Sequence, residues 1–102
     1  MRRAYAQDTT IRIAQSTALT GPLGDLGSAM HQGAKAAFGA INTRGGIHGK
    51  TIELVTQDDA YEVPKALANV EKFLADRETF ALFNCMGTPM IDAMLPKVIE
   101  SG

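Results

Sequence analysis

The chain alternates strand-like and helix-like segments three times, and this alternation limits its fold more than any other feature of the sequence. Runs of β-branched and aliphatic residues at 11–16, 51–56 and 80–85 are typical of strands, and the third is apolar enough for burial on both faces. A loop rich in glycine, proline, aspartate or threonine follows each run, and a segment with helical periodicity follows each loop. We therefore predict a three-layer α/β fold with the element order βαβαβα.

The predicted helices are marked by apolar residues at every third or fourth position and by residues that begin or end a helix. The first apolar stripe comprises Leu26, Met30, Ala34, Ala37, Phe38 and Ile41. Pro64 is expected in the first turn of the second helix. Thr88 followed by Pro89 predicts the N-cap and the first turn of the third helix.

The predicted strands form a small parallel sheet. Right-handed crossovers give the strand order 2-1-3, in which the third strand is an exposed apolar edge. Such an edge is a liability for a free-standing domain, so we expect residues 11–102 to be part of a larger one. The three loops, at residues 20–24, 57–59 and 86–89, must then open at the same edge of the sheet, where α/β proteins bind ligands.

Composition argues against several classes of function. The formal net charge is −1 and there is no basic cluster, which disfavours nucleic acid as a partner, and no apolar stretch is long enough to span a membrane. Cys85 is the only cysteine, and neither His31 nor His48 has a partner at the spacing of metal ligands. We expect both histidines to face solvent and predict no metal, no cofactor and no catalytic group.

The first ten residues permit two interpretations. Arg2-Arg3 and the small residues Ala4-Tyr5-Ala6 before Gln7 are features of an export signal, but the apolar segment that should separate them is absent. Residues 1–10 are therefore expected to be either a flexible tail or the remnant of an export signal.

Four motifs occur in a fixed order along the chain. They are the first strand with Leu19-Thr20-Gly21-Pro22 and Gly27, the segment from Asn42 to Lys50, Asp58-Asp59 with Pro64 and Ala66 downstream, and Gly87-Thr88. Their order and spacing resemble the N-terminal lobe of the type I periplasmic solute-binding proteins of the branched-chain amino acid (Leu/Ile/Val-binding) group, which serve ABC importers.

The resemblance implies a periplasmic or otherwise exported protein that is not an enzyme. Such a protein closes two lobes on an amino acid or a related small carboxylate and delivers it to an ABC permease in the membrane. The chain is expected to be an N-terminal fragment, with three strands of the first lobe and none of the second. The identity of the ligand is not predicted.

The residues that we expect to contact the ligand lie in or beside the three loops. They are Leu26, Asp59, Tyr61, Met86, Gly87 and Thr88. A carboxylate at the start of the third helix would meet free backbone N–H groups around Thr88 and Met90 and the positive end of the helix dipole. The resemblance independently implies that a hydroxyl at the position of Thr88 holds the ligand's carboxylate.

Each of these residues also has a purely structural interpretation. Thr88 can cap its own helix, Leu26 can belong to the apolar stripe of the first helix, and Asp59 can fix its loop by accepting hydrogen bonds from nearby N–H groups. Tyr61 either reaches into the cleft or remains an exposed loop aromatic. Met86 is expected next to the rim of the pocket.

Two other functions fit parts of the pattern. A ligand-sensing receptor domain of the same fold would share all of the residues above. A dinucleotide-binding enzyme domain is suggested by Gly21, Gly24 and Gly27 after the first strand and by Asp58 at the end of the second. The fingerprint of that domain needs a glycine where this chain has Leu23, so this alternative is disfavoured.

Overall fold

The computed structural model describes residues 9–102 and contains, within them, three strands and three helices in the predicted order. The strands are β1 (Thr10–Thr17), β2 (Thr51–Asp58) and β3 (Thr79–Leu82), and the helices are α1 (Gly24–Thr43), α2 (Val63–Ala75) and α3 (Thr88–Ser101). β1 lies in the centre and pairs in parallel with both β2 and β3, so the predicted strand order 2-1-3 is confirmed.

The predicted N-terminal tail or export-signal remnant falls mostly outside the described residues. Of residues 1–10, only Thr9 and Thr10 are described. β1 begins at Thr10, one residue before the predicted strand, and the carbonyl oxygen of Thr9 accepts a hydrogen bond from the backbone N–H of Thr51.

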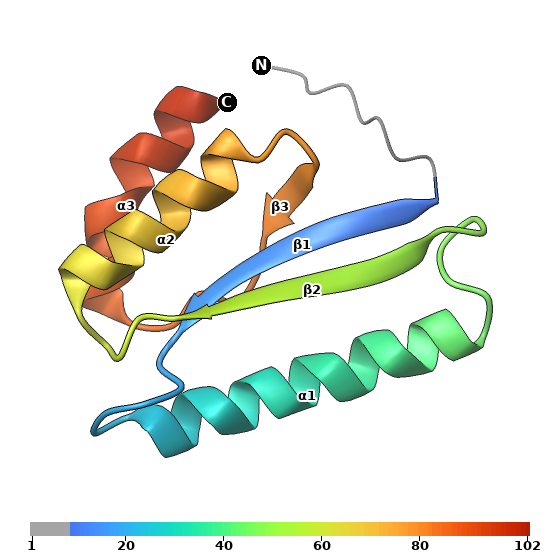
Figure 1. The fold of residues 1–102 in the computed structure, drawn as a ribbon, viewed down its shortest axis with the longest axis horizontal. Coiled ribbons are helices and arrows are strands. Elements are labelled where there is room, and N and C mark those ends of the chain that lie inside the picture. The colour runs from blue at the N-terminus through green and yellow to red at the C-terminus, as the bar shows by residue number, and fades with distance from the viewer. Residues whose placement is uncertain (1–8) are drawn as a thin grey trace.

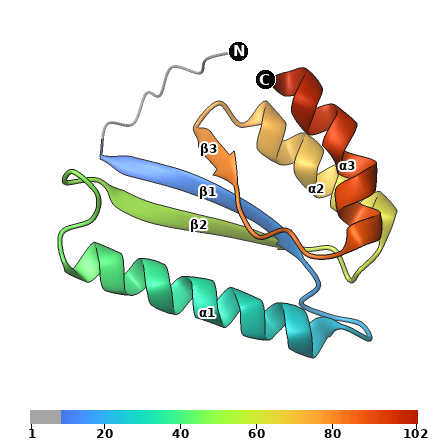
Figure 2. The same ribbon diagram turned by 180° about the vertical axis from the view of Figure 1, so that it is seen from behind.

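The sheet lies between two layers of helices. α1 alone covers one face, along β1 and β2, while α2 and α3 lie side by side on the other (Figures 1 and 2). The crossovers explain this division, because α1 joins neighbouring strands whereas α2 must carry the chain past β1 to the opposite edge of the sheet. With right-handed connections in both cases, the two helices fall on opposite faces.

The apolar core lies mainly between α2, α3 and the sheet. Its buried centre is formed by Ala66, Val70, Met90 and Met94. The core on the α1 face is thinner, with Ala34 and Ile52 buried and the rings of Phe38 and Phe83 in contact at 5.2 Å between centroids. Part of the predicted stripe of α1 stays in solvent, because this helix packs on a narrow sheet with no second helix described beside it.

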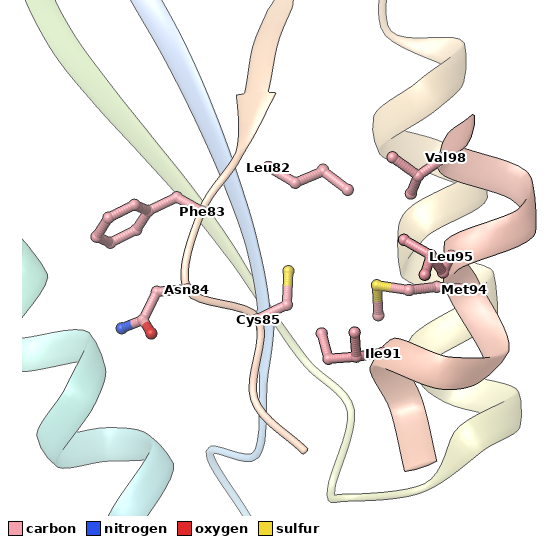
Figure 3. A pocket seen from close by; sticks show the side chains of 8 residues that line it. All are labelled: Leu82, Phe83, Asn84, Cys85, Ile91, Met94, Leu95 and Val98. Carbon is pink, nitrogen blue, oxygen red and sulfur yellow. The ribbon is translucent and has the colours of Figure 1, made fainter. Parts of the chain in front are cut away.

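β3 is shorter than the sequence predicts, and its apolar edge is exposed, as expected. The expected strand covered residues 80–85, but pairing ends at Leu82, and Phe80 is 57% exposed at the edge of the sheet. The physical reason is Asn84, whose φ of 51° lies in the left-handed region and breaks the alternation of side chains. Figure 3 shows Phe83 and Asn84 on the same side of the chain, with Leu82 and Cys85 facing α3.

Two polar contacts that the sequence analysis did not identify hold the far end of the lobe. The side chain of Asn42, near the end of α1, donates to the carbonyl oxygen of Ile52 and accepts from its N–H, at 2.9 and 2.8 Å. Arg12 on β1 forms ion pairs with Glu53 on β2 and Asp76 after α2, each at 2.8 Å. These contacts fix both helices relative to the sheet, so that the loops at the opposite end start from defined positions.

Candidate functional site

The three predicted loops meet at the carboxyl edge of the sheet. We call residues 18–23, 59–62 and 83–87, which follow β1, β2 and β3, the carboxyl-edge loops. All three lie at the same end of the molecule, on the left in Figure 1. Asp58 joins the first two loops, and the ring of Tyr61 in the second lies against Gly87 in the third. The expectation of a common edge is confirmed.

Asp58 fastens the first loop to the second. Its carboxylate accepts hydrogen bonds from the Thr20 hydroxyl at 2.6 Å and from the N–H groups of Leu19, Ala60 and Thr20 at 2.8, 2.9 and 3.2 Å. The hydroxyl of Thr20, followed by the three N–H groups, lowers the pKa of Asp58 to about 2 against the opposing effect of partial burial. This carboxylate is therefore ionised and fully engaged within the protein.

Asp59 belongs to a buried polar network beneath the loops. Its side chain has no solvent exposure and accepts hydrogen bonds from the Ser16 hydroxyl at 2.7 Å and the Tyr61 N–H at 2.9 Å. Asn69 of α2 donates to Ser16 Oγ and to the carbonyl oxygen of Asp58, both at 3.1 Å. The contacts correspond to the loop-fixing alternative for Asp59, and its contact with a ligand stays a prediction.

The second loop contains two adjacent residues in the left-handed region. Ala60 and Tyr61 have φ values of 50° and 62°, a conformation that costs non-glycine residues about 1–3 kcal/mol each. Hydrogen bonds from the Ala60 N–H to Asp58 and from the Tyr61 N–H to Asp59 offset that cost. The strain places the half-buried Tyr61 ring beside the start of α3, where a Cβ added to Gly87 would lie 2.8 Å from the ring.

α3 begins one residue earlier than predicted. Gly87, not Thr88, occupies the N-cap position, and its φ of 106° with ψ of 122° is a conformation that favours glycine. Thr88 is instead the first helical residue; it is exposed, and no side chain caps the helix. The interpretation of Thr88 as the N-cap is therefore wrong, because the chain needs glycine to turn from the loop into α3.

The start of α3 offers hydrogen-bond donors for an anion. The N–H of Ile91 donates to the Gly87 carbonyl oxygen at 2.9 Å, which is the first hydrogen bond of the helix. The N–H groups of Thr88 and Met90 precede that bond and have no partner within the helix, while Pro89 has no N–H to offer. With the exposed Thr88 hydroxyl, these groups form the candidate site for a carboxylate.

The two apolar candidates have different surroundings. Leu26, in the first turn of α1, is 54% exposed, so its side chain is available at the carboxyl edge and is not part of the core. Met86 is only 7% exposed, and its N–H donates to the carbonyl oxygen of Ser16 at 3.2 Å. Met86 thus lies inside the lobe in this structure, whereas the sequence placed it next to the rim.

The remaining reactive side chains do not form a second site. His31 is half-buried with Nδ1 3.1 Å from the Thr56 hydroxyl, which corrects the expectation that it faces solvent. Burial raises the pKa of the Cys85 thiol, so this cysteine is a poor nucleophile. Among residues 9–102, no three His, Cys, Asp or Glu side chains are grouped to hold a metal ion. No helix in the same range is long and apolar enough to cross a membrane.

The glycines of the first loop have structural roles that differ from nucleotide binding. A Cβ on Gly27 would overlap the carbonyl oxygen of Ala18, so this glycine allows α1 to approach the end of β1 closely. Asp58, where a ribose-binding acid would stand, is already bound to Leu19, Thr20 and Ala60. The geometry therefore does not favour the dinucleotide-binding alternative.

Known proteins resemble this chain over most of its length. A family model described as "Periplasmic binding protein" matches residues 10–102. The Leu/Ile/Val-binding protein of Escherichia coli K12 is 36% identical over 73 residues, which is 72% of this chain and 19% of that protein. The leucine-, isoleucine-, valine-, threonine- and alanine-binding protein of Pseudomonas aeruginosa is also 36% identical over 73 residues, 72% of this chain and 20% of its own length.

Solved structures give the same result. A fatty acid ABC transporter substrate-binding protein from Thermomonospora curvata superposes with a TM-score of 0.89 at 28% identity, covering 98% of this chain and 25% of its own. A branched-chain amino acid transporter substrate-binding protein from Streptococcus pneumoniae, in complex with isoleucine, has a TM-score of 0.84 at 27% identity, covering 91% of this chain and 27% of its own.

The matches cover most of this chain but only part of each related protein. The chain spans about a fifth of the length of the curated relatives and about a quarter of the solved chains. The solved neighbours share its parallel sheet and helices, which confirms the type I periplasmic binding protein fold predicted from the motifs. The chain belongs to the periplasmic binding protein family, a family of solute-binding proteins and not of enzymes.

Proposed function

We propose that this chain is part of the ligand-binding lobe of an exported substrate-binding protein that serves an ABC importer. In this proposal the lobe closes, together with a second lobe, on an amino acid or a related small carboxylate, and the complete protein delivers the ligand to a permease. The observation that carries the proposal is the start of α3 at the carboxyl edge, where the N–H groups of Thr88 and Met90 have no partner within the helix and Thr88, with its hydroxyl, is exposed.

The start of α3 suits a carboxylate better than a neutral group. The N–H groups of Thr88 and Met90 and the positive end of the helix dipole all favour negative charge, and the Thr88 hydroxyl adds a donor that no capping interaction uses. The carboxylates of Asp58 and Asp59 already accept hydrogen bonds from the first two loops and from Ser16, so neither takes up the donors at the start of α3.

Apolar groups beside the polar ones favour a ligand with an aliphatic part. Leu26 is exposed in the first turn of α1, and the ring of Tyr61 lies against Gly87. Small-ligand sites generally combine apolar walls with a few directed polar groups. Two curated relatives are named for binding leucine, isoleucine and valine, which agrees with such a ligand. In this arrangement Leu26, Tyr61, Gly87 and Thr88 contact the ligand, while Asp59 and Met86 support them from beneath.

The proposal is tested by titrating the ¹⁵N-labelled chain with L-leucine and following its amide resonances. One lobe supplies only part of the contacts, so we expect weak binding with shifts concentrated at Thr88 and Met90. Thr88→Val keeps the shape of the side chain and removes its hydroxyl, and it should reduce the affinity several-fold without changing the melting temperature. Thr51→Val, at the opposite end of β2, is the matched control.

L-Leucine methyl ester, which lacks the carboxylate, should leave the Thr88 and Met90 resonances unchanged. Equal shifts with the ester, or leucine shifts confined to residues away from α3, would show that the start of this helix is not a carboxylate site.

A further inference from the structure

A row of hydrogen bonds crosses the α1 face of the sheet and ends at the loop before α3. Nδ1 of His31 on α1 lies 3.1 Å from the hydroxyl of Thr56 on β2. That hydroxyl donates to Oε1 of Gln15 on β1 at 3.1 Å, and Nε2 of Gln15 donates to the carbonyl oxygen of Asn84 at 3.2 Å. The row connects the outer helix to the third carboxyl-edge loop through the central strand.

The chemistry of the groups fixes the direction of every bond in this row. The Asn84 carbonyl oxygen can only accept, so the end of the Gln15 amide that faces it must be the NH₂ group. Oε1 of Gln15 then accepts the single proton of the Thr56 hydroxyl. Because that proton is used, Thr56 Oγ1 can only accept from His31, and Nδ1 of His31 must carry a proton.

Gln15 is well placed to control the loop. Its side chain is fully buried, so an unpaired amide there would be costly, and both ends of the amide have partners. The loop also forms two backbone hydrogen bonds with β1. The Phe83 N–H donates to the carbonyl oxygen of Ala14 at 2.8 Å, and the Met86 N–H donates to that of Ser16 at 3.2 Å. Between these two backbone bonds, the side chain of Gln15 bonds to Asn84, the residue at which the backbone turns.

That turn sets the direction in which α3 begins. Asn84 has a φ of 51°, and in this left-handed conformation its carbonyl oxygen accepts the hydrogen bond from Gln15. Three residues later Gly87 makes the second turn, with a φ of 106°, and α3 starts at Thr88. A change at Asn84 would therefore move the donors at the start of α3.

We propose that Gln15 is a positioning residue for the ligand site. It holds Asn84 in the left-handed turn and so fixes the start of α3, and the same amide, through Thr56, selects the Nδ1–H tautomer of His31. The interpretation of the start of α3 as a ligand site rests on the proposed function, but the row of hydrogen bonds is present without a ligand. The two can therefore be tested separately.

The tautomer is tested by ¹⁵N NMR of the His31 imidazole at a pH where the ring is neutral. We expect the Nδ1–H form to predominate in the unaltered chain. In Gln15→Met the Thr56 hydroxyl is free to donate to Nδ1, and the Nε2–H form should become the main one. A predominant Nε2–H form in the unaltered chain, or the same tautomer in both proteins, would overturn the proposal.

The positioning role is tested by amide hydrogen exchange. In Gln15→Met, exchange at Met86 should become about tenfold faster relative to the amides that pair β1 with β2, as expected for loss of one buried hydrogen bond. Gln57→Met, an exposed change on β2, is the matched control and should leave the ratio unchanged. A uniform acceleration in all elements, or an unchanged ratio in Gln15→Met, would refute local positioning.

Two further measurements keep the outcomes distinct. If Gln15→Met does not fold, Thr56→Val breaks the row while keeping the bond from Gln15 to Asn84, and loss of the Nδ1–H preference in that variant supports the proposal. The leucine titration of the unaltered chain separates the two ideas. A lack of shifts at Thr88 would reject the proposed function alone, whereas an equal leucine affinity in Gln15→Met and the unaltered chain would reject the positioning role.

Discussion

Asp58 is the residue whose removal should most directly loosen the carboxyl edge. Asp58→Ala deletes a carboxylate that accepts four hydrogen bonds, from Leu19, from Ala60 and twice from Thr20. Hydrogen bonds to charged groups contribute about 1.5–3 kcal/mol each, but the two donors of Thr20 are exposed and can turn to water. The part-buried N–H groups of Leu19 and Ala60 therefore account for most of the loss.

The pKa of Asp58 gives an independent figure for the same interaction. The shift from 3.8 to about 2 corresponds to roughly 2.5 kcal/mol, which must be reduced by about half because solvent screens the carboxylate. The reduced pKa figure, about 1 kcal/mol, is the lower figure, and the bonds from Leu19 and Ala60, at about 1.5 kcal/mol or more each, give about 3 kcal/mol. We therefore expect a loss of about 1–3 kcal/mol in the free energy of unfolding, or a melting temperature lower by roughly 4–24 °C for a domain of this size.

Urea unfolding followed by circular dichroism measures this loss, since the chain has no tryptophan to report it by fluorescence. Asp58→Asn keeps an oxygen for the N–H groups of Leu19 and Ala60 and should lose about half as much as Asp58→Ala. Asp92→Ala, an exposed change on α3, is the control. If Asp58→Ala and Asp92→Ala differ by less than about 0.5 kcal/mol, the assignment of Asp58 as the link between the loops is refuted.

Two further predictions concern acid and a glycine. Because Asp58 has a pKa of about 2 in the folded chain and 3.8 as its ordinary value, its contribution should be present above about pH 4 and lost towards pH 2. The pH dependence of urea unfolding should thus be flatter in Asp58→Ala, and an identical profile would contradict the argument. Gly27→Ala should destabilise the chain by about 1–3 kcal/mol in thermal melts, because the new methyl group would overlap the carbonyl oxygen of Ala18. Gly33→Ala, in open space on the same helix, should instead stabilise it by up to about 1 kcal/mol.

The layout of the fold follows from local patterns and general rules, which is why the sequence predicts it. Helical periodicity, strand-like runs and the turn residues between them establish the element order. Right-handed crossovers then leave the strand order 2-1-3, as the structure has it. The common edge of the three loops is a consequence of parallel strands, so its location needed no knowledge of side-chain contacts.

Details at the end of β3 could not be predicted because they depend on contacts with β1. The apolar run from Phe80 to Cys85 does not indicate that Asn84 adopts a left-handed turn and that its carbonyl oxygen accepts a hydrogen bond from Gln15. The shift of the N-cap from Thr88 to Gly87 has the same origin, since Gly87 makes the turn that the loop needs. Gly87 is a sequence signal for this turn, but the capping preference of threonine favours an N-cap one residue later, at Thr88.

The adjacent residues Asp58 and Asp59 differ in burial. Asp58 and Asp59 are identical in type, and successive residues in extended chain point to opposite sides. One therefore reaches the exposed first loop through Thr20, while the other is buried against Ser16 on the α2 side. Sequence indicates that the pair fixes loops, but only the register of β2 against β1 decides which aspartate is buried.

The buried network has a consequence for how the site would choose its ligand. Asp59, Ser16 and Asn69 hold the second loop from below, and Gln15 holds the third, so the donors at the start of α3 are arranged without a ligand. A ligand then spends little binding free energy on ordering these loops, and its affinity depends on the groups that it touches. Those groups are exposed side chains such as Leu26, which the fold does not need for its core. Ligand preference in this lobe should therefore change through substitutions at the exposed edge, while substitutions in the network beneath should alter the affinity for all ligands together.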